Sequence, residues 1–295
     1  MNMRKFVFYT CFVFLGWLTT ACGGKVGQNE KVRTISVTLE PLRYFVGALA
    51  GDRFRVVSLV PEGTSPETYD PTPRQLVDLG KSEAYFRIGY IGFEQVWMNR
   101  LKENAPQMRV FDTSEGIEVI RQHEEEHEGH HHVEGVEPHI WNSTNNARLI
   151  AANICRALCE LDAGHEEVYK HRLDSLNLVI QKTDSVVRSL LDGGDRMFLI
   201  YHPALSYFAR DYGLVQIPIE EHGKEPSPAY LKKLIDLCRK EAVNVIFVQP
   251  EFDVRHAEVI ATQTQTRVYP VNPLSYNWAE EMIAVAHALN RQEKP

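Results

Sequence analysis

The sequence alternates short runs of β-branched and aromatic residues with longer segments in which apolar residues recur every three or four positions. This alternation predicts an α/β fold whose strands are mainly parallel. The strand-like runs fall into two sets of four, and each set is expected to form one sheet flanked by helices. The first set comprises residues 34–39, 55–60, 84–88 and 108–111, and the second comprises 197–201, 214–217, 243–248 and 267–271.

A long helical pattern separates the two sets of strands. Residues 163–191 contain no proline and no glycine after Gly164, and Asp192-Gly193-Gly194 gives a good C-terminal stop. At 1.5 Å per residue, one helix of this length would be on the order of 40 Å long. We expect one stiff linker helix, with two shorter helices as the alternative. Its apolar face is formed by Tyr169, Leu173, Leu176, Ile180, Thr183, Val187 and Leu190.

These patterns divide the chain into two predicted domains, as its length of 295 residues favours. The N-terminal α/β domain is expected over 32–162, the linker helix over 163–192 and the C-terminal α/β domain over 193–295.

The beginning of the chain has the pattern of a bacterial export signal. Arg4 and Lys5 precede thirteen uncharged residues, a length typical of a signal peptide and short for a membrane span. The sequence Leu-Thr-Thr-Ala-Cys that ends at Cys22 resembles a lipobox, although its Leu lies four residues before the Cys instead of three. We therefore expect 1–21 to be a lipoprotein signal peptide, Cys22 to carry the lipid, and 22–31 to be a flexible tether. The protein would then be extracytoplasmic and anchored to a bacterial membrane; plain secretion is the alternative.

The formal net charge of -7 excludes nucleic acid as a partner, because a phosphate-binding face needs clustered excess Lys and Arg. Cys155, Cys159 and Cys238 remain outside the signal segment, and Cys155 and Cys159 share a helix face. An intrahelical disulfide there would be awkward, so free thiols are the favoured interpretation.

An acidic, His-rich loop is predicted over 121–135. It contains a formal H-E-x-x-H pattern, but its charged flanks and its glycines give no apolar helix that could dock beside a cleft. Such a composition can bind zinc or copper weakly and in many registers. Its candidate auxiliary metal ligands are His123, His127, His130, His131 and His132.

Two isolated histidines give a stronger signal. His139 lies between Pro138 and an Ile-Trp pair, which constrain the backbone and give the ring apolar support. His202 directly follows the strand-like run 197–201, and open α/β sheets bind their ligands at the carboxyl ends of strands. Either histidine alone would be compatible with a purely structural role.

Taken together, the chain resembles the metal-specific solute-binding proteins of ABC importers, the zinc and manganese class, over essentially its whole length after the signal segment. The resemblance implies a binding protein with no catalytic residues, which captures a divalent metal between two domains, acts as a monomer and delivers the metal to a membrane permease. The segments that carry it are 63–73 (GTSPETYDPTP), 137–141 (EPHIW), 201–208 (YHPALSYF), 225–228 (EPSP) and 271–274 (VNPL).

The resemblance implies the metal ligands Glu67, His139, His202 and Asn272. All four follow strand-like runs, so they would face one crevice. Two of them depart from the family pattern, since Glu67 replaces a usual His and Asn272 a usual Asp. A Glu remains a competent zinc ligand, whereas an Asn carbonyl is weaker. Water, a nearby carboxylate or His222 could complete the set.

Zn²⁺ is the expected metal, because His202 stands where manganese binders of this family carry Glu and imidazole suits zinc. Glu67 adds an oxygen ligand, which suits chemically harder cations, so Mn²⁺ and Fe²⁺ remain alternatives. Two other classes also stay open. One is a zinc hydrolase with Glu67 or Glu251 as its base, and the other is an adhesin or structural lipoprotein.

Overall fold

The computed structural model describes residues 33–122, 135–221 and 223–291. Its contacts group Arg33–Pro295 as one compact unit. The predicted signal peptide, the tether, the anchor Cys22 and the auxiliary candidate His222 lie outside the described residues, as do the five histidines of the His-rich loop. None of the helices in the described ranges combines the length and apolar character needed to span a membrane.

The first half of the chain forms a four-stranded sheet in the order β2-β1-β3-β4, and all of its neighbouring strands are parallel. In the register, Ile35 of the central strand β1 lies beside Val56 on one side and Ala84 on the other. Each strand coincides with one predicted run to within a few residues. The strands are β1 (Thr34–Val37), β2 (Arg55–Ser58), β3 (Ala84–Arg87) and β4 (Arg109–Asp112).

The second half forms another parallel four-stranded sheet, in the order β10-β9-β7-β8. The prediction of two four-stranded parallel sheets flanked by helices is therefore confirmed. The strands are β7 (Met197–Ile200), β8 (Val215–Pro218), β9 (Val245–Val248) and β10 (Arg267–Pro270).

The remaining elements connect the strands and cover the sheets. A two-residue antiparallel pair, β5 (Arg121–Gln122) with β6 (Gly135–Val136), closes the base of the predicted His-rich loop and was not predicted. Cys155, Cys159 and Cys238 are free, as expected. The helices other than the linker helix are α2 (Glu40–Ala50), η1 (Gly51–Arg53), α3 (Pro73–Leu79), α4 (Gly92–Asn104), α5 (Thr144–Leu161), α7 (Ser206–Tyr212), α8 (Pro228–Glu241), α9 (Arg255–Thr264) and α10 (Trp278–Leu289).

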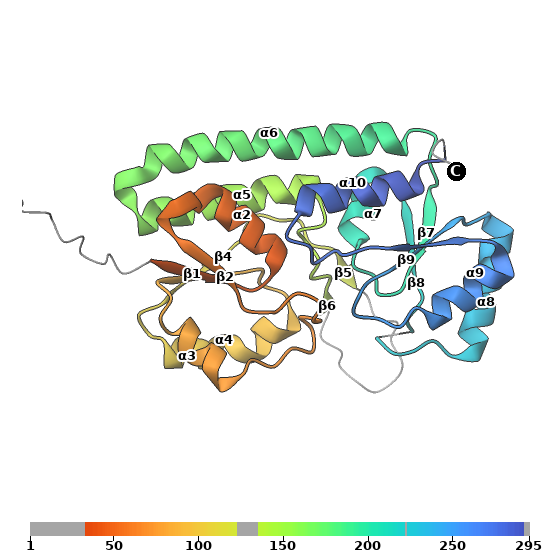
Figure 1. Cartoon of the computed structure of the whole chain (residues 1–295), viewed down its shortest axis with the longest axis horizontal. Coiled ribbons are helices and arrows are strands. Elements are labelled where there is room, and N and C mark those ends of the chain that lie inside the picture. Colours follow the sequence, from red (N-terminus) through yellow and green to blue (C-terminus); the bar gives the residue numbers. More distant parts are fainter. Residues whose placement is uncertain (1–32, 123–134, 222, 292–295) are drawn as a thin grey trace, which may run out of the picture. The chain divides into compact units, whose positions relative to one another are not determined.

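The predicted linker helix is a single element, α6 (Glu166–Leu191), preceded by a short 3-10 turn, η2 (Ala163–His165) (Figure 1). It packs on α5 and α2 from the first half and on α10 from the second. Its buried residues, Tyr169, Leu176, Ile180, Thr183, Val187 and Leu191, recur at helical spacing along one face. One stiff helix therefore packs against elements from both halves of the chain.

The hydrophobic core is continuous between the two halves. Successive strand residues point to opposite faces of a sheet, so β7 contributes to two clusters. Phe198 belongs to the main cluster, which also contains Phe86 of the first sheet. Leu199 belongs to a smaller cluster that α8 and α9 cover. A contact between rings shows the continuity directly, since Phe45 of α2 packs on Trp278 of α10 with their centroids 5.2 Å apart.

Candidate metal site

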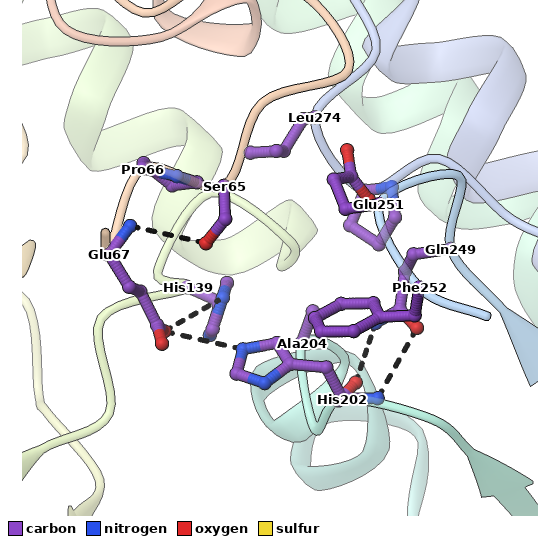
Figure 2. A pocket seen from close by; sticks show the side chains of 11 residues that line it. Ser65, Pro66, Glu67, His139, His202, Ala204, Gln249, Glu251, Phe252 and Leu274 are labelled. Atoms are coloured by element: carbon purple, nitrogen blue, oxygen red, sulfur yellow. Dashed lines mark hydrogen bonds and ion pairs between the residues drawn. The ribbon is translucent and has the colours of Figure 1, made fainter. Parts of the chain in front are cut away.

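Glu67, His139 and His202 meet in the structure, and each offers one ligand atom within 4.8 Å of the others. The Glu67 carboxylate oxygen Oε1 lies 3.3 Å from Nε2 of His202 and 3.9 Å from Nε2 of His139 (Figure 2). The two imidazole rings lie close together, with centroids 5.1 Å apart. Two ring nitrogens and one carboxylate oxygen at this separation form a compact ligand set for a cation.

Glu67 lies in the loop between β2 and α3, and the structure anchors both sides of that loop. Thr72 caps α3 through a reciprocal capping box with Gln75, and the Gln75 side chain also donates a hydrogen bond to the carbonyl of Leu59 (3.2 Å). Gly92, the first residue of α4, packs on the loop, since a Cβ there would lie only 3.2 Å from the Glu67 carbonyl oxygen. The Glu67 side chain itself is 39% exposed.

His139 lies between β6 and α5 and is buried. Its ring nitrogen Nδ1 forms a short contact with the Glu137 carboxylate, and its backbone N–H donates to the same carboxylate oxygen (3.1 Å). The hydroxyl of Tyr207 donates to the Glu137 carbonyl (2.8 Å), which ties this segment to α7. The His139 side chain is 6% exposed and that of Glu137 is 2% exposed, so water has little access to the pair.

His202 directly follows β7 and is held from three sides. Its Nδ1 lies 3.0 and 3.1 Å from the two carboxylate oxygens of Glu220. The Gln249 side-chain amide donates to the His202 carbonyl (2.6 Å) and accepts from its backbone N–H (3.3 Å). The ring of Phe252 stacks on the imidazole, with an interplanar angle of 20°.

Both histidines therefore use Nδ1 to contact a buried carboxylate and turn Nε2 toward Glu67. A carboxylate of this kind fixes the tautomer and the ring orientation of a metal-binding histidine and increases its basicity. Sequence analysis assigned no role to Glu137 or Glu220. Glu137 could have been found from its position two residues before His139. Glu220 follows β8, the strand next to β7, so its contact with His202 could be recognised only from the fold.

The charges around the three residues favour a cation. Burial alone would lower the pKa of His202, but its hydrogen bonds with Glu220 and Glu67 outweigh burial and raise that pKa to about 10. The same hydrogen bond to His202 lowers the pKa of Glu67. In the metal-free site a proton on His202 thus neutralises part of the carboxylate charge, and a metal ion would take the place of that proton.

Asn272, the fourth expected ligand, does not point into this group. Its Oδ1 accepts the backbone N–H of Leu274 (3.1 Å), and its own N–H donates to Glu281 of α10 (2.7 Å). It is absent from the wall of the cavity beside the three residues. That wall is formed by Ser65, Pro66, Glu67, His139, His202, Ala204, Gln249, Glu251, Phe252, Pro273 and Leu274.

Two tryptophans hold the walls of the site together. The indole N–H of Trp141 donates to the carbonyl of Pro273 (2.7 Å), and the indole N–H of Trp278 donates to the carbonyl of Trp141 (2.8 Å). Both side chains are fully buried. The segment that carries His139 is thereby attached to the segment after β10.

Residues 35–289 match the family model described as zinc-uptake complex component A, periplasmic (ZnuA). The chain belongs to this family. It is 26% identical over 285 residues to the high-affinity zinc uptake system protein ZnuA of Bacillus subtilis, covering 91% of this chain and 87% of that protein. It is 25% identical over 268 residues to the metal ABC transporter substrate-binding lipoprotein FimA of Streptococcus parasanguinis, and the match covers 87% of this chain and 84% of FimA.

Solved structures agree with this assignment. A crystal structure of ZnuA is 34% identical and has a TM-score of 0.81, covering 87% of this chain and 97% of the other. A zinc-bound ZnuA with residues 138–173 deleted is also 34% identical and has a TM-score of 0.79, and the match covers 90% of this chain and 100% of the other. The resemblance inferred from the sequence segments is confirmed, and the protein is a metal-binding substrate-binding protein of the ZnuA family.

Proposed function

We propose that the protein captures Zn²⁺ with Glu67, His139 and His202 and delivers it to an ABC importer. The observation that carries this proposal is the convergence of two Nε2 atoms and one carboxylate oxygen within 4.8 Å. Zinc binds His nitrogen and Glu oxygen, and imidazole ligands favour it over manganese. The names of the Bacillus subtilis relative and of one structural neighbour refer to zinc, which supports the same metal.

The Glu67 oxygen is the observation that favours a second candidate, Mn²⁺ or Fe²⁺. Oxygen ligands suit these harder ions, and the MtsA relatives from Streptococcus pyogenes are named for iron. Two of the three converging residues are histidines, and imidazole ligands suit zinc, so zinc remains the proposed cargo.

The proposal includes the path of the metal. Cys22 would carry a lipid that holds the protein on the outer side of a bacterial membrane, and the folded body would act there as a monomer beside the permease. Its task would be capture and release without turnover. In this arrangement 32–162 and 193–295 would act as two domains joined by the helix predicted over 163–192.

Competition between metals tests the cargo. The metal-free protein is dialysed against equimolar Zn²⁺, Mn²⁺ and Fe²⁺ without oxygen, washed with a weak chelator to clear loosely bound ions, and analysed for metal content. We expect one zinc per chain. Preferential loading with manganese or iron would overturn the choice of zinc.

A matched pair of histidine variants tests the site. His202→Ala removes a proposed ligand, whereas His171→Ala removes an exposed imidazole from α6. We expect the first variant to lose the tightly bound zinc and the second to keep it. If His202→Ala retained zinc at the wild-type level after the wash, the three-residue site would be wrong even though the protein binds metal.

A further inference from the structure

The three converging residues leave a proposed zinc site incomplete. Zinc in proteins is bound almost always by four ligands in a tetrahedral arrangement, and Glu67, His139 and His202 supply three. The amide of Asn272 is engaged by the backbone of Leu274 and does not line the cavity. A fourth donor would therefore come from water, from His222, which lies outside the described residues, or from another residue in the cavity wall.

Glu251 is the other carboxylate in that wall. It lies just beyond β9, on the opposite side of the cavity from Glu67 (Figure 2). Its Oε1 is buried and has no hydrogen-bond partner among the residues that the structure describes. A buried carboxylate oxygen without a donor is unfavourable, because it has lost its water and gained nothing in return. A cation in the cavity would supply the missing partner.

The segment that carries Glu251 is attached to His202. Gln249, two residues before Glu251, holds both the N–H and the carbonyl of His202, and Phe252, one residue after it, stacks on the imidazole ring. The backbone of Glu251 is thus fixed relative to one of the proposed ligands. Its carboxylate lies outside the group of three whose atoms fall within 4.8 Å, so the side chain would have to adopt another rotamer to approach an ion held there.

We propose that the Glu251 carboxylate is the fourth ligand of the bound metal and takes the role expected of residue 272. This inference rests on the proposed function, since it completes the same site. The occupied site would then hold two imidazoles and two carboxylates, which leaves a Zn²⁺ complex with no net charge. The Glu251 carboxylate would come from the segment that follows β9, and the Asn272 amide would keep its hydrogen bond to the backbone N–H of Leu274.

The test compares the metal alone on the wild-type chain and on three single variants. Glu251→Gln replaces the anionic oxygen with a neutral amide of the same size, and Asn272→Ala removes the alternative ligand. Glu258→Gln is the matched control, because it removes the same charge from an exposed position on α9. Zinc affinity is measured by competition with a chromophoric chelator, and Co²⁺ is substituted to report the coordination number through its visible absorption.

We expect Glu251→Gln to weaken zinc binding by at least the ~10-fold to 100-fold that loss of an outer-shell partner causes. The Co²⁺ spectrum should also change in band position and intensity, because a ligand has been replaced. Asn272→Ala and Glu258→Gln should leave the Co²⁺ spectrum as in the wild type. Thermal unfolding of each metal-free variant separates these effects from loss of folding.

The possible failures are distinguishable. If the wild-type chain binds neither ion tightly, or if His202→Ala binds them equally well, the proposed function fails. If the wild type binds and His202→Ala does not, while Glu251→Gln keeps both the affinity and the Co²⁺ spectrum, only the assignment of Glu251 is overturned. If Asn272→Ala alters the Co²⁺ spectrum and Glu251→Gln does not, the fourth ligand is the Asn272 amide and the assignment of Glu251 is wrong.

Discussion

Glu94 gives the sharpest test of the electrostatics behind this fold, because it is a carboxyl group that the structure buries almost completely. It lies in the first turn of α4 and is 1% exposed. Its carboxylate accepts hydrogen bonds from the Thr38 hydroxyl and from the backbone N–H groups of Ile88 (2.8 Å) and Gly89 (2.5 Å). Burial outweighs these donors and raises the pKa of Glu94 from its ordinary 4.5 to about 7.

The raised pKa predicts a specific dependence of stability on pH. Between pH 4.5 and 7 the folded chain holds a proton on Glu94 that the unfolded chain has released, so the free energy of unfolding falls as the pH rises through this window. The contribution is fully present below pH 4.5 and lost above pH 7. The difference between these two pKa values corresponds to about 3 kcal/mol, at about 1.4 kcal/mol per pKa unit.

Urea unfolding of the metal-free protein at several pH values between 4.5 and 8 measures this term. Glu94→Gln cannot titrate, so the free energy of unfolding should fall less for the variant than for the wild type across the window, by about 3 kcal/mol. The amide in Glu94→Gln also loses an acceptor for a backbone N–H, which destabilises the variant by the same amount at every pH and does not affect the slope. Glu258→Gln controls for the loss of one acidic group. Equal slopes for the wild type and Glu94→Gln would refute the argument.

The remaining predictions concern the site and the packing around it. Glu220→Gln should lower the pKa of His202 from about 10 toward its ordinary value, because the anionic partner of Nδ1 is lost, and an NMR titration of the metal-free protein would show it. Ile180→Ala on the buried face of α6 should cost about 2–5 kcal/mol in urea unfolding, whereas Val179→Ala, at 41% exposure, should cost far less. Trp278→Phe should cost at least about 1–3 kcal/mol, since it leaves the buried carbonyl of Trp141 without its donor.

The fold could be predicted because its local signals agree with its packing. Each strand-like run became a strand, since a sheet covered on both faces requires continuous apolar runs such as Val-Ile-Phe-Val in β9. The linker helix followed from an unbroken helical period and a clear stop at Gly193, whose φ is +72°. The pair β5–β6 was missed because two residues per strand carry no periodic signal.

The site was predictable only in part. His139 was proposed because it lies between Pro138 and an Ile-Trp pair, His202 because it follows a buried strand, and Glu67 through the resemblance. The carboxylates that orient the two imidazoles could not be paired with them from the sequence, because Glu220 follows a different strand from His202 and their contact depends on sheet order. The side chain of Asn272 illustrates the same limit, since its hydrogen bond to Leu274 is a matter of local loop geometry.

The three residues of the proposed metal site differ in how easily their side chains can move. Separating His139 from His202 would break the hydrogen bonds from Trp141 to Pro273 and from Trp278 to Trp141, and it would open a hydrophobic core shared by both sheets. Exposing that core is costly at about 25 cal/mol for each Å² of apolar surface. The Glu67 loop is anchored, but its side chain is 39% exposed, against 6% and 16% for the side chains of His139 and His202. In the proposed site, the Glu67 side chain would therefore move to admit or release an ion while the two imidazoles stay in place.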